Sequence, residues 1–304
     1  MKKIITNKLG LPNAYVFAVV NDPYDPDDGG EKSDYTITGL LKPPQAVQLE
    51  RDNVIEIDAA DYLAILQGQL IHYMLERAKP TLEAQGFVVE RRFYKKYPIH
   101  MPDGFTRIFN VSAKIDVFDP IEGRLSDYKY TSTASANHGL KEEHRLQVNF
   151  QSMLIRNVGF KVEKAETVML MKDWSPMKLF GNYPLSPTSL HPVPFMKDSE
   201  IDLYIIERIK AHEAAKVNLP LCSDKEKFNS PTFAIIKEGQ SKAVRVFKSE
   251  KEAIDFCSGT NYSIVKRSGT NINCLHYCPA RSICEQAKAD RPAVILDEDG
   301  FVKV

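Results

Sequence analysis

Hydrophobic and polar positions alternate along the chain with two different periods, and these periods divide it into predicted helices and strands. Apolar residues at helical spacing predict helices over residues 58–78, 141–157 and 197–216. Alternation with a period of two, in stretches rich in β-branched and aromatic residues, predicts strands over residues 87–97, 107–118 and 162–173. We therefore expect an α/β fold, in which a central mixed sheet is flanked by helices.

Helix-capping and turn residues refine the boundaries of these predicted elements. Asp58 is a good N-cap for the first helix, and Gly159 is a good stop for the second. Pro120 to Gly123 form a predicted turn that joins strand 107–118 to the short strand after it. Towards the C-terminus, the pattern predicts a hairpin and then a short helix, over residues 233–247 and 249–257.

Composition changes along the chain and predicts four regions. Residues 21–34 are rich in Asp, Pro and Gly, as flexible loops are, while five cysteines occur late in the sequence. The regions we expect are a flexible N-terminal segment, a core, a cysteine-bearing subdomain and a tail, over residues 1–34, 35–216, 217–290 and 291–304.

The overall composition is that of a globular protein, because 43% of the 304 residues are hydrophobic and 26% are charged. Lys plus Arg and Asp plus Glu both number 40, so an anionic partner would have to be met by a local basic surface. The sequence contains no apolar run long enough for a membrane span and no secretory signal at its start. We therefore expect a cytoplasmic protein with no membrane partner.

Two acids and a lysine fall on the predicted hairpin around residue 120. Asp116 and Asp127 flank its turn, and Lys129 shares a face with Asp127 because side chains repeat with a period of two. Two neighbouring carboxylates repel each other unless a cation lies between them, and carboxylate oxygens suit Mg²⁺ or Mn²⁺. A lysine beside such a site can orient a water and stabilise phosphate charge. The alternative is a solvated Asp–Lys pair on an exposed hairpin.

The cysteines form a second candidate site. Cys274, Cys278 and Cys284 lie within CLHYCPARSIC, and three thiolates so close together are typical of a metal site. Sites of four cysteines hold either Zn²⁺ or a [4Fe–4S] cluster. For the fourth ligand we favour the cysteine in the loop LPLCSDKEKF over two other candidates; the three are Cys222, Cys257 and His276.

The hairpin resembles the core of the PD-(D/E)XK nucleases, with Asp116 as the first acid and Asp127 and Lys129 as the D-x-K. The stretch GQLIHYMLE, which contains His72, resembles the G-x-x-x-H-x-x-L-E helix of the RecB-like branch, which includes phage exonucleases. The stretch LQVNFQSML, which contains Gln147, resembles the Q-x-x-x-Y helix of that branch. The chain departs from these motifs in two places, because alanine and glutamine replace the family glycine and tyrosine, at Ala113 and Gln151.

This resemblance implies a Mg²⁺- or Mn²⁺-dependent DNA nuclease, and we expect an end-processing exonuclease of recombination or repair. The alternatives are a single-strand or flap endonuclease and a catalytically silent DNA-binding module of the same fold. The implied metal ligands are His72, Asp116, Asp127 and the carbonyl of Tyr128, with Lys129 and Gln147 assisting catalysis. The resemblance also favours [4Fe–4S] over zinc, held by Cys222, Cys274, Cys278 and Cys284.

DNA, as ends or single strands, is the expected partner, together with a single-strand annealing or recombination protein, in a bacterial or phage-infected cell. Basic residues interleaved with aromatic ones would suit a DNA strand, and the stretch RRFYKKY has this composition. Its basic residues are Arg91, Arg92, Lys95 and Lys96. The alternative is a solvated strand face.

Overall fold

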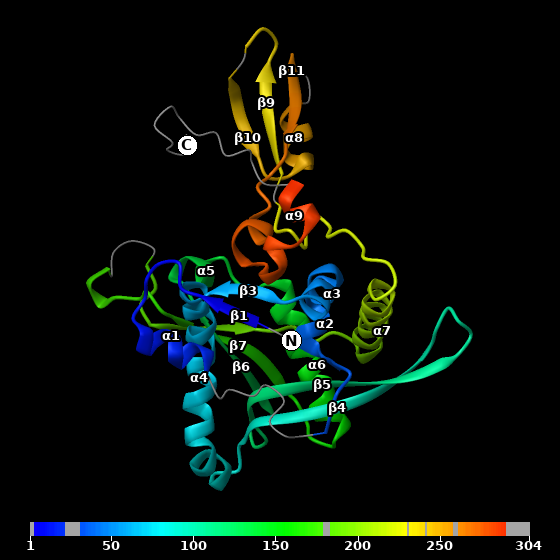
Figure 1. The fold of residues 1–304 in the computed structure, drawn as a ribbon. Helices are drawn as coiled ribbons and strands as arrows, with labels where there is room; N and C mark the ends of the chain where they lie inside the picture. The colour runs from blue at the N-terminus through cyan, green and yellow to red at the C-terminus, as the bar shows by residue number, and fades with distance from the viewer. Residues whose placement is uncertain are drawn as a thin grey trace. The chain divides into compact units, whose positions relative to one another are not determined.

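The computed structural model describes residues 3–21, 31–178, 183–229, 231–240, 242–257 and 261–289, which belong to two compact units (Figure 1). The larger unit comprises Ile4–Leu41 and Ile57–Ala214. The smaller unit comprises Met1–Lys3, Lys42–Glu56 and Ala215–Val304. The predicted tail, residues 291–304, and most of the predicted loop at 21–34 lie outside the described residues.

A six-stranded mixed sheet forms the centre of the larger unit. Its strands follow the order β2-β5-β6-β7-β8, and β4 pairs with β5 as well. The β2–β5 and β6–β7 pairs are parallel, while β4–β5, β5–β6 and β7–β8 are antiparallel. The strands are β2 (Tyr35–Thr36), β4 (Val88–His100), β5 (Thr106–Asp119), β6 (Arg124–Thr131), β7 (Lys164–Met171) and β8 (Thr188–Pro192).

Helices cover both faces of this sheet, as the expected α/β fold requires. The neighbouring residues Val117 and Phe118 point to opposite faces, and they pack into two different hydrophobic clusters. The cluster around Val117 includes side chains of α4, while the cluster around Phe118 includes side chains of α2, α6 and α7. The helices of the larger unit are α1 (Asn13–Val20), α2 (Ile37–Leu41), α4 (Ala59–Ala84), α5 (Thr133–Asn137), α6 (Glu142–Asn157) and α7 (Asp198–Ala215), with a 3₁₀ turn η1 (Pro176–Lys178).

The long helix α4 starts where its cap predicts. The Asp58 side chain accepts a hydrogen bond from the Ala60 amide, which satisfies one of the unpaired donors of the first turn. The helix continues through Pro80, beyond the predicted end at residue 78. The chain segment just before α4 pairs with the N-terminal strand in a two-stranded sheet of β1 (Lys3–Thr6) and β3 (Ile55–Asp58).

The smaller unit combines a separate sheet with a compact set of turns. Its antiparallel sheet has the order β10-β9-β11, and α8 packs against the apolar side chains of Phe233 and Ile235. The early segment of this unit contributes α3, which packs near the turns that carry the cysteines. Its elements are α3 (Pro44–Asp52), β9 (Thr232–Lys237), β10 (Ala243–Phe247), α8 (Glu250–Cys257), β11 (Tyr262–Arg267), the π-helical turn η2 (Asn273–Tyr277), the 3₁₀ turn η3 (Pro279–Ser282) and α9 (Glu285–Ala289).

Two regional boundaries differ from the sequence-based expectation. The segment expected to be flexible contains β1 and α1, because β1 finds a pairing partner in β3. Residues 42–56, expected within the core, belong to the smaller unit, because α3 packs against the late turns of the chain. No helix among the described residues is long and apolar enough to cross a membrane.

Candidate functional site

The polar site of the larger unit lies at an interruption in the pairing of β5. On one side, the β5–β6 ladder reaches Val117 opposite Ser126 and stops one residue short of Asp116 and Asp127. On the other side, the β4–β5 register passes over Asp116, whose counterpart on β4 is Glu90. Acidic side chains from three strands therefore converge where the strands separate.

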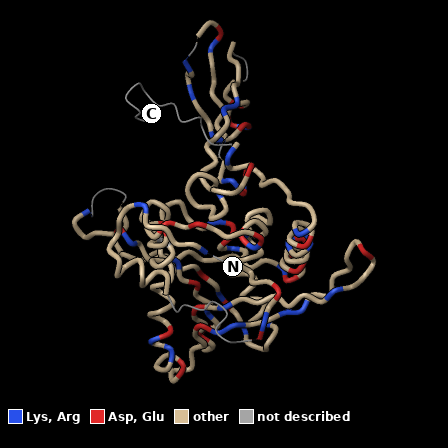
Figure 2. Tube along the Cα trace, in the orientation of Figure 1, with Lys and Arg blue, Asp and Glu red and all other residues tan. Residues whose placement is uncertain are grey.

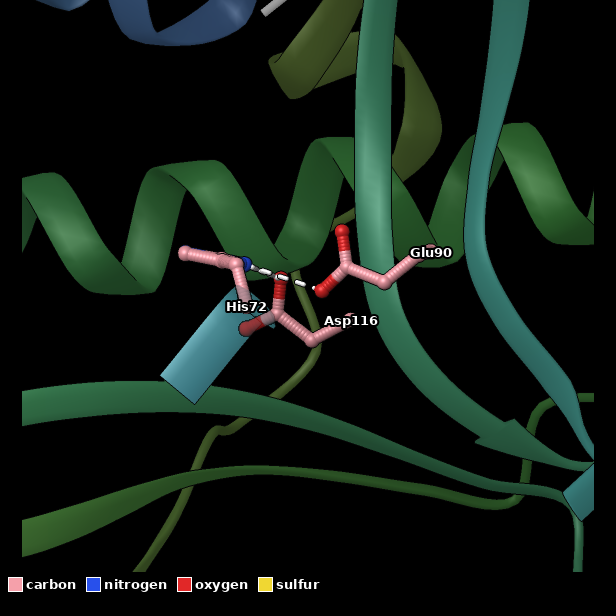
Figure 3. A group of neighbouring side chains, drawn as sticks. All are labelled: His72, Glu90 and Asp116. Carbon is pink, nitrogen blue, oxygen red and sulfur yellow. Dashed lines mark hydrogen bonds and ion pairs between the residues drawn. The ribbon is translucent and has the colours of Figure 1, made fainter. Parts of the chain in front are cut away.

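His72, Glu90 and Asp116 form a group of candidate metal ligands, with one ligand atom of each within 4.8 Å of the other two (Figure 3). The Nδ1 atom of His72, which lies on α4, is 2.9 Å from Oε1 of Glu90 and 3.6 Å from Oδ1 of Asp116. Both acids are buried, and the His72 side chain is 25% exposed. One imidazole nitrogen and two carboxylates are a donor set that suits Mn²⁺, Mg²⁺ or Zn²⁺.

Glu90 is the member of this group that the sequence analysis missed. Its backbone has φ +46°, a left-handed conformation that non-glycine residues rarely adopt and that often marks a functional position. This conformation interrupts the alternation of β4 and turns the carboxylate towards His72. The only sequence signal is an acid in the otherwise apolar start of a strand, in FVVERR. This signal does not indicate a site by itself, because only the strand register places Glu90 opposite Asp116.

Asp127 is held by two neighbours rather than by the His72 group. Its Oδ1 accepts a hydrogen bond of 2.8 Å from Nε2 of Gln147 on α6, and its Oδ2 lies 2.7 Å from Nζ of Lys129. The side chain is fully buried. The structure thus brings the two sequence-predicted assistants, Lys129 and Gln147, directly onto the second acid.

Tyr128 links the two acids through its backbone. Its amide N–H donates a 2.6 Å hydrogen bond to Oδ2 of Asp116, so the strand that carries Asp127 also positions Asp116. A further lysine contacts Glu90. Nζ of Lys114, two residues before Asp116 on β5, is 3.0 Å from Oε2 of Glu90 and 3.0 Å from Oε1 of Glu76.

Burial and mutual charge shift the pKa values of these groups. Burial, followed by the charge of Asp127, raises the pKa of Asp116 to about 7. Burial alone would lower the pKa of Lys129, but the charges of Asp127 and Asp116 outweigh it and raise that pKa. Burial opposes protonation of His72 as well, yet the bond to Glu90 and the charge of Asp116 raise its pKa. The buried carboxylates therefore give the site a negative electrostatic potential, which favours the binding of cations.

His144, also unpredicted, lies on α6 one turn before Gln147 and its side chain is 17% exposed. Burial, with the positive charge of Lys129 as the next cause, lowers its pKa to about 4. The ring is therefore neutral at neutral pH beside a lysine that is charged.

In the smaller unit, the predicted cysteine ligands line one cavity together with Gln45 of α3. The Gln45 side-chain oxygen is 3.1 Å from the Cys222 sulfur and 3.9 Å from the Cys284 sulfur. Gln286 of α9 fixes the loop, because it accepts from the Cys222 amide at 2.8 Å and donates to the Cys222 carbonyl at 2.9 Å. The cysteines that line the cavity are Cys222, Cys274, Cys278 and Cys284.

The other two candidates for the fourth ligand do not line this cavity. Cys257 packs with the apolar cluster beneath α8, and His276 is exposed. Burial raises the pKa of the Cys222 thiol to about 12 and that of the Cys278 thiol to about 11, so bound metal would have to displace protons from both. Among the described cysteines, no three sulfurs lie within 4.8 Å of one another, so they do not form a closed metal cage as they stand.

The basic residues of β4 differ in their surroundings, since some are held in ion pairs or hydrogen bonds and others are exposed. Nζ of Lys95 lies 2.7 Å from Oδ1 of Asp202, which also accepts from the buried Tyr97 hydroxyl. By contrast, Arg91 and Lys96 are exposed, and Arg91 lines an open groove beside Phe160. Arg92 lines the same groove but is half-buried and donates a 3.1 Å hydrogen bond to the Ser112 hydroxyl. Figure 2 shows basic positions along the β4–β5 ribbon.

Comparisons with known proteins give no family for this chain. No known protein family and no curated protein matches the sequence. The crystal structure of SSO0001 is similar over 59% of this chain and 77% of its own, with 16% sequence identity and a TM-score of 0.39. A similarity of this size carries no conclusion about fold or function.

Proposed function

We propose that the protein is a metal-dependent DNA nuclease with a PD-(D/E)XK-like site. The observation that carries the proposal is the convergence of His72, Glu90 and Asp116 within ligand distance, beside Asp127 and Lys129 on the adjoining strand. Hard oxygen ligands with one imidazole suit Mn²⁺ or Mg²⁺. Glu90 joins the ligands expected from the resemblance, and the Tyr128 carbonyl remains an expectation.

The residues divide the catalytic work between them. A divalent cation at His72, Glu90 and Asp116 would polarise a phosphodiester and lower the pKa of a water. Lys129 acts as a cation rather than as a base, because its raised pKa keeps the ammonium protonated. The ammonium can then stabilise the negative charge that develops on the phosphate. Gln147 orients Asp127, since its amide holds one carboxylate oxygen while Lys129 holds the other.

End-processing exonuclease action in recombination or repair is the form of activity we favour. Purified protein should be incubated with end-labelled linear DNA and with closed circular DNA, with Mg²⁺, Mn²⁺ or EDTA. We expect metal-dependent degradation of the linear DNA only. Nicked circles would instead support the single-strand or flap endonuclease, and binding without cleavage would support the silent module.

A [4Fe–4S] cluster held by Cys222, Cys274, Cys278 and Cys284 is part of the proposal. Zinc is the less favoured ion, because Zn–S bonds of about 2.3 Å require ligand sulfurs only about 3.8 Å apart, and no three of the described cysteine sulfurs lie within 4.8 Å of one another. In a cluster, each thiolate binds a different iron, which spreads the ligands further. DNA ends or single strands, and a recombination or annealing protein, remain the proposed partners.

A further inference from the structure

Lys114 lies between two acids at the margin of the proposed metal site. Its ammonium lies 3.0 Å from both Glu90 and Glu76, and its side chain is only 13% exposed. Glu90 is shared, because its other oxygen faces His72. A metal ion bound by His72, Glu90 and Asp116 would therefore have the Lys114 ammonium as its neighbour across one carboxylate.

We propose that the site takes one divalent cation and that the ammonium of Lys114 stands where a second ion would otherwise bind. The inference rests on the proposed function. In two-metal sites, carboxylates bridge ions about 3.5–4 Å apart. Glu90 is in the position of such a bridge, but Lys114 already takes its second oxygen.

Charge balance leads to the same number of ions. Four carboxylates are in direct contact with His72, Lys114 or Lys129, those of Glu76, Glu90, Asp116 and Asp127, and the two ammonium groups are those of Lys114 and Lys129. With His72 neutral, as a metal ligand must be, the formal charge is −2. One divalent cation neutralises it. Without Lys114 the charge becomes −3, and Glu76 and Glu90 are freed to hold a second cation.

The test counts Mn²⁺ ions bound to the full-length protein, by titration calorimetry and by the EPR signal of free Mn²⁺. Mn²⁺ is suitable because thiolates do not select it. We expect one ion in the wild type and in Lys114→Arg, which keeps the charge, and two ions in Lys114→Ala. Lys95→Ala is the matched control, because it removes an ammonium from a different ion pair, with Asp202, and should still give one ion.

Two ions in the wild type, or one ion in a folded Lys114→Ala, would overturn the inference. Thermal melting shows whether Lys114→Ala folds, since it leaves a buried acid without its partner. If that variant does not fold, Lys114→Gln, which keeps a polar side chain without the charge, replaces it in the count. The titration uses no DNA, so one bound ion without cleavage refutes the proposed function alone, while two ions with cleavage refute the inference alone. A protein that binds no Mn²⁺ refutes both.

Discussion

Glu90 binds His72 with one carboxylate oxygen and Lys114 with the other, so the arrangement of the site depends directly on this residue. If it is a metal ligand, Glu90→Gln should weaken Mn²⁺ binding by at least about tenfold, as the loss of groups around metal sites commonly does. Calorimetric titration of the folded variant measures this. Glu166→Gln is the matched control, because that acid pairs with Ser126 outside the ligand group. Wild-type affinity in Glu90→Gln would remove Glu90 from the site.

His144 should make stability depend on pH. Its folded pKa of about 4 is below the value of about 6.5 expected for an unfolded histidine, so the unfolded chain binds a proton first as the pH falls. Stability is therefore lost between about pH 6.5 and pH 4. Compared with His144→Gln, the wild type should lose more of its melting temperature between pH 7 and pH 5 in EDTA. A difference independent of pH would contradict this explanation.

Sequence motifs located His72, Asp116, Asp127, Lys129 and Gln147, and the structure places each of them at the junction of β5 with its neighbours. Their motifs have fixed spacing within a helix or a hairpin, so local pattern suffices to find them. Glu90, Lys114 and His144 could not be found in this way. Their positions depend on strand register, on an irregular backbone and on packing between elements distant in sequence.

At the scale of elements, β4 is the strand that would meet DNA. Among the strands that the structure describes, it pairs with β5 alone, and its groove residues follow directly after Glu90. For a single-stranded oligonucleotide, log K against log salt has a slope of about −0.7 per phosphate contact. Arg91→Ala and Lys96→Ala should each flatten this slope by about 0.7 units. Fluorescence anisotropy in EDTA measures the binding without cleavage.

Lys210→Ala is the control for this experiment, because Lys210 is an exposed cation on α7 that does not line the groove beside Arg91 and Arg92. It should leave both affinity and slope unchanged. If the β4 variants behave like the control, the basic residues of β4 serve instead to prevent pairing of its open edge with another chain.

The long elements follow from periodicity, while the short ones do not. The structure contains α6, α7 and the β4–β5–β6 succession close to the predicted limits, because each has enough residues for its apolar period to be recognised. Strand β2 has two residues and α2 has five, so neither shows a period. The continuation of α4 through Pro80 also could not be predicted, since proline normally ends a helix.

At the scale of the whole molecule, the cysteines should decide the integrity of the smaller unit. Protein purified without oxygen should be brown and contain iron, as thiolate-bound iron–sulfur clusters give. Cys222→Ala should lose colour and iron, because its sulfur lines the shared cavity, whereas Cys257→Ala should keep both. Iron analysis and visible absorption measure this. A colourless protein with one zinc would retain the ligands and change the cofactor, and the reverse result for the two variants would make Cys257 the fourth ligand.

The path of the chain through the two units has a consequence for biosynthesis. Helix α3 leaves the ribosome early, but the turns against which it packs, starting at Cys274, are made about 220 residues later. At synthesis rates of about 5–20 residues per second, α3 waits roughly 10–45 s for its partners. During that interval, Gln45 and Glu50, buried in the finished protein, face water or a chaperone. The thiol cavity is therefore among the last parts of the protein to assemble, and translation speed sets the earliest moment at which a cofactor can enter it.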